Sequence, residues 1–272
     1  MKKLLITILS IMTIFFVLLL YSRFIGTTGL ITHEIALKEQ IPESYKGLKI
    51  IHFSDLHYKK VITEKRVKDL IKEINRNKPD IILFTGDLLD KDYQLTNKDI
   101  NFLIKYLKKL NPKYGIYAIM GDQDYSNEEA LKNIYLQSNI TLLKNETTYI
   151  YNENNDKIAL TGLESYLKDM DINKSYTSLD ENTYHITMVH EPDAIKEILE
   201  NEKTSNLILA GHSINGSINI PIIKNLLLPT GAKKIKSSEL KNKNVYISNG
   251  IGVNNVNFRL FNTPSINLYR FN

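Results

Sequence analysis

Apolar runs alternate with amphipathic segments along the first half of the chain, and this alternation constrains the fold more than any other feature. Three short runs have the pattern of buried strands, at residues 48–54, 80–85 and 115–120. Three segments between and after them have the apolar spacing of surface helices, at residues 63–77, 96–111 and 126–138. Thr63 is the expected N-cap of the first helix. Strands and helices in this order predict a parallel sheet covered by helices.

The rest of the chain is richer in strand patterns. One strand is expected before the alternating region, at residues 29–38, and a further helix at residues 193–202. Later strands are expected in ITLLKN, TTYIYN, DKIALTGLE, YHITMVH (184–190), NLILAGH (206–212), INIPII (218–223), NVYISNG and SINLYRF. So many strands fit a two-sheet α/β sandwich flanked by helices better than one doubly wound sheet.

The N-terminal segment has the pattern of a membrane anchor. Lys2 and Lys3 precede residues 4–21, which carry no charge and are long enough to cross a hydrocarbon core of about 30 Å. A cleaved signal peptide is the alternative, but the apolar stretch is long for one and no small-residue cleavage site follows it. We therefore expect residues 1–28 to form an uncleaved single-pass anchor with its flank, and residues 29–272 to form one domain. The two lysines place that domain outside the cytoplasm, although Arg23 on the other flank opposes this orientation.

Charge and cysteine content exclude several function classes. The net charge of +5 would suit nucleic acid, but the lysines alternate with acids along segments such as EKRVKDLIKEINRNK. That pattern is typical of a solvated helix face, so no nucleic-acid partner is expected. The chain has no cysteine, which excludes disulfides, thiolate zinc sites and cysteine nucleophiles.

Five predicted strands carry Asp or His in the first two positions after their ends, with Gly before three of them. The residues at these strand ends are Asp55-Leu56-His57, Gly86-Asp87, Gly121-Asp122-Gln123-Asp124, His190 and Gly211-His212. Open α/β sheets bind ligands beyond the carboxyl ends of their strands, so we expect these side chains to converge. Three carboxylates and three imidazoles in one crevice suit one or two divalent cations. Three other histidines fall inside strands and are expected to be structural: His33, His52 and His185.

The motifs D-L-H, G-D, G-D-Q-D, H-E-P and G-H-S-I-N-G, in this order, resemble the calcineurin-like metallophosphoesterase family. The family pattern is D-x-H, G-D, G-N-H-D/E, H-x-P and G-H-x-H, and the resemblance covers about residues 48–272. The tail YISNGIGVNNVNFRLFNTPSINLYRF is similar to the ending of the membrane-anchored bacterial branch. The resemblance implies a phosphoesterase with one or two divalent cations (Mn, Fe, Zn or Mg). It implies a first metal on Asp55 and His57, a bridge at Asp87, and a second metal completed by Asp122, His190 and His212.

Three positions depart from the family pattern. Gln123 stands where the family has the histidine that contacts the phosphate and assists the leaving group. Ile214 stands where the last ligand of the first metal is found, and Asp122 replaces an asparagine. Isoleucine cannot coordinate a cation, so the second metal site is expected to be occupied and the first to be weak. His57, if it is free of metal, is the candidate substitute acid.

Two function classes remain open on these residues. One is a membrane-anchored phosphoesterase with a degenerate active site, acting on a phosphomonoester or phosphodiester. For its substrate, the anchored branch of the family suggests a lipid-linked or envelope compound. The other class is a pseudoenzyme, a metal- or phosphate-binding module that serves a membrane partner.

Overall fold

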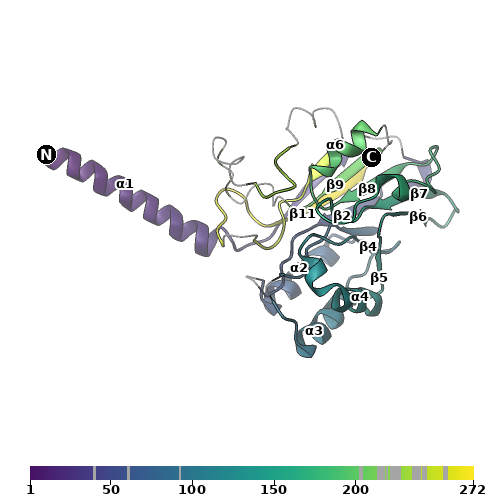
Figure 1. Ribbon diagram of the computed structural model, residues 1–272, viewed down its shortest axis with the longest axis horizontal. Helices are drawn as coiled ribbons and strands as arrows, with labels where there is room; N and C mark the ends of the chain where they lie inside the picture. The colour runs from purple at the N-terminus through teal and green to yellow at the C-terminus, as the bar shows by residue number, and fades with distance from the viewer. Residues whose placement is uncertain are drawn as a thin grey trace.

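Two β-sheets stack face to face in the computed structural model of the chain, and helices cover both outer faces (Figure 1). The structure describes residues 1–38, 41–59, 62–91, 93–201, 205–212, 218, 220, 228–234, 240, 244–253 and 257–272. Among these residues the first sheet has six strands and the second has five. The expected two-sheet α/β sandwich flanked by helices is confirmed.

The first sheet contains the alternating region. In spatial order its strands are β1 (Ile31–Leu37), β11 (Ser265–Phe271), β2 (Lys49–Phe53), β3 (Ile81–Phe84), β4 (Ile116–Ala118) and β5 (Ile140–Leu142). Strands β2 to β5 run parallel, as the strand–helix alternation predicts. The C-terminal strand β11 enters between β1 and β2, parallel to the former and antiparallel to the latter.

The second sheet is built from the later strands. In spatial order they are β10 (Val245–Ile247), β9 (Leu207–Ala210), β8 (His185–Val189), β7 (Lys157–Gly162) and β6 (Glu146–Tyr151). All neighbours are parallel except β6 and β7. The strand expected at INIPII lies largely outside the described residues. Within that segment, Ile218 forms a single β-bridge to Leu260.

Alternation along the strands assigns side chains to two cores. In β3, Ile81 and Leu83 face the second sheet, while Ile82 and Phe84 face the helices. Both faces are therefore buried, which explains why the parallel strands read as continuous apolar runs in the sequence. The core between the sheets also receives apolar side chains from β7, β8 and β9, including Leu160, Met188 and Leu209.

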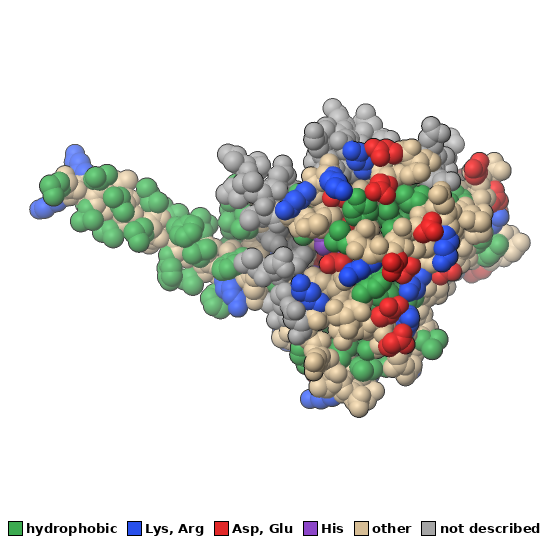
Figure 2. Space-filling model, in the orientation of Figure 1, with side chains coloured by type: hydrophobic (Ala, Val, Ile, Leu, Met, Phe, Trp, Pro, Cys, Tyr) green, Lys and Arg blue, Asp and Glu red, His purple; other side chains and the backbone are tan. Residues whose placement is uncertain are grey.

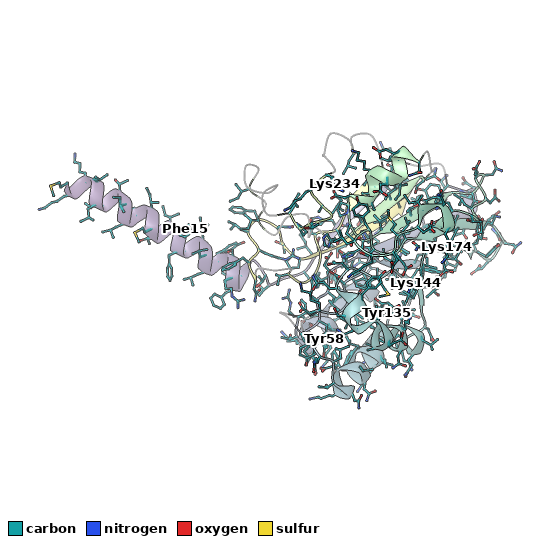
Figure 3. The ribbon with its side chains drawn as sticks, viewed as in Figure 1. Phe15, Tyr58, Tyr135, Lys144, Lys174 and Lys234 are labelled. Carbon is teal, nitrogen blue, oxygen red and sulfur yellow. The ribbon has the colours of Figure 1, made fainter. Side chains whose placement is uncertain are left out.

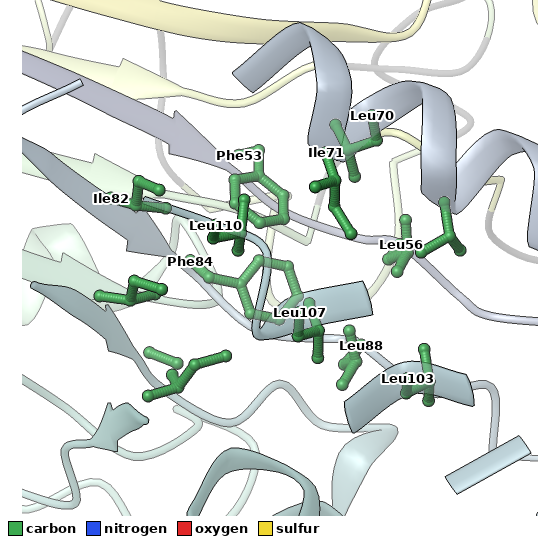
Figure 4. Packing of buried hydrophobic residues seen from close by; sticks show 14 of the residues in the cluster. Phe53, Leu56, Leu70, Ile71, Ile82, Phe84, Leu88, Leu103, Leu107 and Leu110 are labelled. Atoms are coloured by element: carbon green, nitrogen blue, oxygen red, sulfur yellow. The ribbon is translucent and has the colours of Figure 1, made fainter. Parts of the chain in front are cut away.

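Three amphipathic helices cover the outer face of the first sheet: α2 (Glu64–Arg76), α3 (Asn97–Leu107) and α4 (Glu128–Gln137). Figure 4 shows their apolar side chains, such as Ile71 and Leu107, packed around Phe53 and Phe84 of the sheet. Thr63 accepts a hydrogen bond from the backbone N–H of Arg66, which confirms it as the N-cap of α2. Two short helices, α5 (Ile172–Ser175) and α6 (Ala194–Glu200), pack against the second sheet.

The N-terminal helix α1 (Lys2–Leu20) projects away from the domain (Figure 1). Its surface is apolar with lysines at the free end (Figure 2), and its mean hydropathy of 2.7 fits a membrane span. A π-helical turn, η1 (Tyr21–Ile25), continues it to the domain. There the backbone N–H of Arg259 donates to the carbonyl of Ser22 over 2.9 Å, and Ser22 is buried. Short 3-10 turns complete the fold at η2 (Glu43–Tyr45) and η3 (Asp124–Asn127).

Truncation of a leucine between the sheets should test this core. Leu83 is fully buried there, whereas Leu136 on α4 is 78% exposed. We expect Leu83→Ala to lower the free energy of unfolding by about 2–5 kcal/mol, because it removes buried contacts and leaves a cavity. Leu136→Ala should change it by less than about 0.5 kcal/mol. Urea unfolding followed by circular dichroism measures both, and equal losses would contradict the assigned core.

Candidate metal centre

Five strands from both sheets deliver their following residues to one region. Asp55 and His57 follow β2, and four more side chains follow β3, β4, β8 and β9: Asp87, Asp122, His190 and His212. They form two clusters that share Asp87, and within each cluster one donor atom per residue lies within 4.8 Å of the others. We call Asp87, Asp122, His190 and His212 the four-residue cluster, and Asp55, His57 and Asp87 the three-residue cluster. The convergence expected at the strand ends is therefore present.

The backbone turns sharply at these strand ends. Four of the six residues have positive φ angles: Asp55 at 54°, His57 at 46°, Asp87 at 58° and His212 at 60°. This left-handed region is uncommon outside glycine, and Asp and His tolerate it better than most residues. Such conformations cost free energy and cluster at functional sites. Here they turn the side chains into the space between the two sheets' ends.

Two glycines allow the ends of β3 and β4 to touch. Gly86 has φ 90°, and a Cβ there would collide with the backbone of Gly121 and lie 2.8 Å from Nδ1 of His190. A Cβ on Gly121 would collide with the carboxylate of Asp87. Any larger residue at either position would therefore displace Asp87 or His190.

The four-residue cluster has the spacing of a coordination shell. Nδ1 of His212 lies 3.2 Å from both Oδ1 of Asp122 and Nε2 of His190. Nε2 of His190 lies 3.5 Å from Oδ1 of Asp122 and 3.4 Å from Oδ2 of Asp87. Donors bound at about 2.1 Å to one cation lie about 3.0–3.4 Å apart at octahedral or tetrahedral angles. The observed separations fall close to that range.

Backbone carbonyls fix the tautomers of the two histidines. Nδ1 of His190 donates to the carbonyl of Thr85 over 2.6 Å, and Nε2 of His212 donates to the carbonyl of Thr230 over 2.6 Å. The opposite ring nitrogens therefore turn their lone pairs toward each other and toward the carboxylates. Hydrogen bonds of this kind orient the histidines that bind metals. Two converging lone pairs repel unless a cation or a proton lies between them.

The donor atoms of the three-residue cluster lie farther apart than those of the four-residue cluster. Nε2 of His57 lies 3.7 Å from Oδ1 of Asp55 and 3.7 Å from Oδ2 of Asp87. Oδ2 of Asp87 therefore faces His57 on one side and His190 on the other, as a bridging carboxylate would. All three residues of this cluster are fully buried.

The carboxylates of Asp55 and Asp87 are each held by one oxygen and present the other. Oδ2 of Asp55 accepts from the hydroxyl of Ser54 and from the backbone N–H of His212. Oδ1 of Asp87 accepts from the backbone N–H of Gln123 over 3.0 Å. The remaining oxygens, Oδ1 of Asp55 and Oδ2 of Asp87, have no hydrogen-bond donor among the described residues. Buried, unsatisfied carboxylate oxygens beside imidazole nitrogens are the donor set that a divalent cation fits.

Electrostatic coupling across the site supports this interpretation. Burial alone would raise the pKa of Asp55, but His57 and His190 hold it below its ordinary value. Burial opposes protonation of His190 and His57, yet the neighbouring carboxylates raise the pKa of both. Metal-free protein would thus hold protons where cations would otherwise balance the carboxylates, and cation binding would release them.

Asp124 ties the β3 and β4 ends together, a role that the sequence did not specify. Its carboxylate accepts backbone N–H bonds from Asp87 (2.8 Å), Leu89 (3.0 Å) and Gly121 (3.0 Å). Burial and the neighbouring Asp87 raise the pKa of Asp124 to about 7. Its place in G-D-Q-D was the available signal. The carbonyls of Thr85 and Thr230, by contrast, leave no trace in the sequence.

Gln123 and three further histidines lie in the part of the chain that the structure describes. Gln123 is buried beside Asp87. Ile214 lies outside the described residues, so the missing first-metal ligand stays a prediction. His33, His52 and His185 lie outside both clusters, as expected. Burial lowers the pKa of His52 to about 3, which keeps this ring neutral.

Comparisons with known proteins point to one family. The family model for calcineurin-like phosphoesterases matches residues 48–241. The Bacillus subtilis proteins "uncharacterized metallophosphoesterase" YkuE and YkoQ are each 28% identical, over 92% and 97% of this chain and 88% and 98% of their own lengths. A "transmembrane protein with metallophosphoesterase domain" from Danio rerio is 23% identical over 84% of this chain and 54% of its own.

His185, which begins strand β8, and His190, which follows it, allow a matched test of metal binding. We expect His190→Ala to reduce the metal bound per chain at least about tenfold, because ring nitrogen Nε2 lies within the four-residue cluster. His185→Ala removes an equally buried ring, whose Nε2 lies 2.7 Å from the hydroxyl of Thr161, and should retain the metal. Inductively coupled plasma mass spectrometry measures both. Unchanged metal content in His190→Ala would exclude the cluster as the binding site.

Proposed function

The chain belongs to the calcineurin-like phosphoesterase family, and from this premise we propose that it is a membrane-anchored hydrolase of phosphate esters with two unequal metal sites. The observation that carries the proposal is the pair of clusters joined through Asp87. Paired divalent cations, when bound, activate water and stabilise the attacking and leaving oxygens of a phosphoryl group. In this proposal Asp55, His57 and Asp87 hold the first cation, and Asp87, Asp122, His190 and His212 hold the second.

Two features support a stronger second site. The donor contacts of the four-residue cluster are 3.2–3.5 Å, whereas those of His57 in the three-residue cluster are 3.7 Å. Asp87 and Asp122 also balance the charge of one divalent cation, while Ile214 would leave the first site without its last imidazole. The metal is Mn, Fe, Zn or Mg, which all accept nitrogen and oxygen donors.

Two side chains are proposed to act on the substrate. Gln123 is buried next to Asp87, where its amide would orient the phosphate but has no proton to transfer. His57 lies between two carboxylates that raise its pKa, so in the absence of a first cation it would protonate the leaving oxygen. A positioned acid contributes about 10²–10⁴-fold to a rate. Because Gln123 stands where the family has a histidine, we expect turnover to be slow.

The helix Lys2–Ile25 is proposed to anchor the domain in the membrane. No residue of α1 is buried in the domain, and Lys2 and Lys3 favour an extracytoplasmic domain. The anchor also lies close to the proposed active site. Arg259 bonds to the carbonyl of Ser22 through its backbone and to the carbonyl of Gly252 through its guanidinium, and Gly252 donates to the carbonyl of Asp55. This proximity supports a lipid-linked or envelope phosphate ester as substrate.

A pseudoenzyme is the second candidate, and Gln123 and Ile214 favour it. In that case the clusters would bind a cation or phosphate without turnover and serve a membrane partner. The two candidates predict different results when histidine is introduced at positions 123 and 214: only the enzyme should gain rate in phosphate-ester hydrolysis.

We expect the unmodified protein to bind one cation tightly and a second weakly. Ile214→His should raise the metal content toward two per chain with a modest gain in rate. Adding Gln123→His should raise the rate by about 10²-fold or more, because it supplies an acid at the leaving group. Gln137→His, on the exposed face of α4, is the matched control and should change neither. Metal titration and hydrolysis of phosphomonoester and phosphodiester probes test these variants.

Two equally tight cations in the unmodified protein would contradict the unequal sites. A double variant that binds two cations but gains no rate would favour the pseudoenzyme.

We expect the full chain to remain in the membrane fraction after an alkaline carbonate wash, because the helix spans the bilayer. N-terminal sequencing should find the mature protein beginning before residue 4. A mature start near residues 24–30 would instead show a cleaved signal peptide and refute the anchor.

A further inference from the structure

A groove of about 700 Å³ lies where the apolar helix meets the domain. One wall is the end of the helix, with Arg23, Phe24 and Thr27, and the other is the first turn of α2, with Thr63, Lys65 and Arg66. None of these residues belongs to the two metal clusters, so the groove needs its own explanation.

Cations dominate the groove. Arg23, Lys59, Lys65 and Arg66 line it, against one acid, Glu64. Lys59 is neutralised by Asp99 at 3.0 Å. The other three cations form no ion pair with any described residue, which leaves a net positive surface at this junction. The arrangement is complementary to an anion with exposed oxygens.

Arg66 is the most telling of the three unpaired cations. It is half-buried, and burial lowers its pKa, so the guanidinium pays a desolvation cost without a counter-charge. A planar guanidinium suits the paired oxygens of a phosphate.

The groove continues into a hollow with an apolar wall. This hollow of about 310 Å³ shares Lys65 and Arg66 with the groove and adds Leu30, Leu70 and Ile251, together with the acid Asp69. Cations beside an apolar wall are complementary to an amphipathic molecule with an anionic headgroup and an apolar chain.

The position of the groove identifies that molecule. Arg23 and Phe24 belong to the last turn of the span Lys2–Ile25, so they lie at the depth of the lipid headgroups when the helix crosses the bilayer. Phe24 and Ile25 are exposed by 65% and 59%, as expected of side chains at a membrane interface. We propose that this groove binds the phosphate headgroup of an anionic membrane phospholipid and so holds the domain against the bilayer surface.

The inference rests on the anchoring proposed above and is independent of catalysis. Free inorganic phosphate offers the same oxygens, but the apolar wall and the depth of the groove favour a lipid. Each Lys or Arg near an anionic surface contributes about fivefold to binding.

Native mass spectrometry tests the groove on the full chain, released from detergent micelles that contain equal amounts of phosphatidylglycerol and phosphatidylcholine. The chain should retain phosphatidylglycerol in preference, and Arg66→Gln should lower that preference about fivefold. Lys65→Gln, at an exposed position, should lower it similarly and covers the case in which Arg66→Gln fails to fold. Lys174→Gln is the matched control, because Lys174 is exposed on the side of the domain away from α1 (Figure 3).

Equal retention of both lipids by the unmodified chain would overturn the proposal. So would a loss in Lys174→Gln as large as in Arg66→Gln, since net charge alone would then explain the preference. Displacement of the lipid by excess inorganic phosphate would assign the groove to a soluble anion instead. Loss of the chain from the membrane fraction on carbonate washing would contradict the proposed anchor. A chain that stays in the membrane but shows no lipid preference would contradict only the lipid-binding groove.

Discussion

The carboxylate of Asp87 is the contact on which both clusters depend. One of its oxygens faces His57 and His190 together, and the other is fixed by the backbone N–H of Gln123. Its own backbone N–H is held by Asp124, and the missing side chain of Gly121 makes room for it. The strand ends of β3 and β4 must therefore meet at this point for either cluster to form. The sheet order, with β2, β3 and β4 adjacent, makes that meeting possible.

The buried charges of the site couple cation binding to the stability of the folded state. Unpaired carboxylate oxygens in a water-poor site are costly, and imidazole lone pairs that face one another add repulsion. Protons on the histidines relieve this in the absence of metal, which is why their pKa values rise. A bound cation would relieve it better and would stabilise the folded state by mass action. The strained backbone at Asp55, His57, Asp87 and His212 is tolerable in such a setting because the surrounding contacts over-determine it.

Arg259 links the end of the apolar N-terminal helix to this site. Its guanidinium is fully buried and donates to the carbonyls of Gly250, Gly252 and Asn262, and burial lowers its pKa to about 9. Gly252 in turn donates its backbone N–H to the carbonyl of Asp55. The backbone N–H of Arg259 donates to the carbonyl of Ser22 at the end of the helix. The site thus has a fixed relation to the end of the apolar helix and to the basic groove beside it.

The sequence by itself determined the secondary-structure elements and which Asp and His side chains come together. Period-2 and period-3.6 patterns are local, so β2, β3, α2 and α3 were predicted within a few residues of their bounds. Parallel strands end at one edge, so the Asp and His residues behind them were expected to meet. What only the tertiary structure decided is how each donor atom is used. The carbonyls of Thr85 and Thr230 choose the histidine nitrogens, and Asp124 fixes the backbone of Asp87. The basic groove joins residues about 40 positions apart. Such contacts depend on how sheets, turns and helix ends stack in space, and no local periodicity records that stacking.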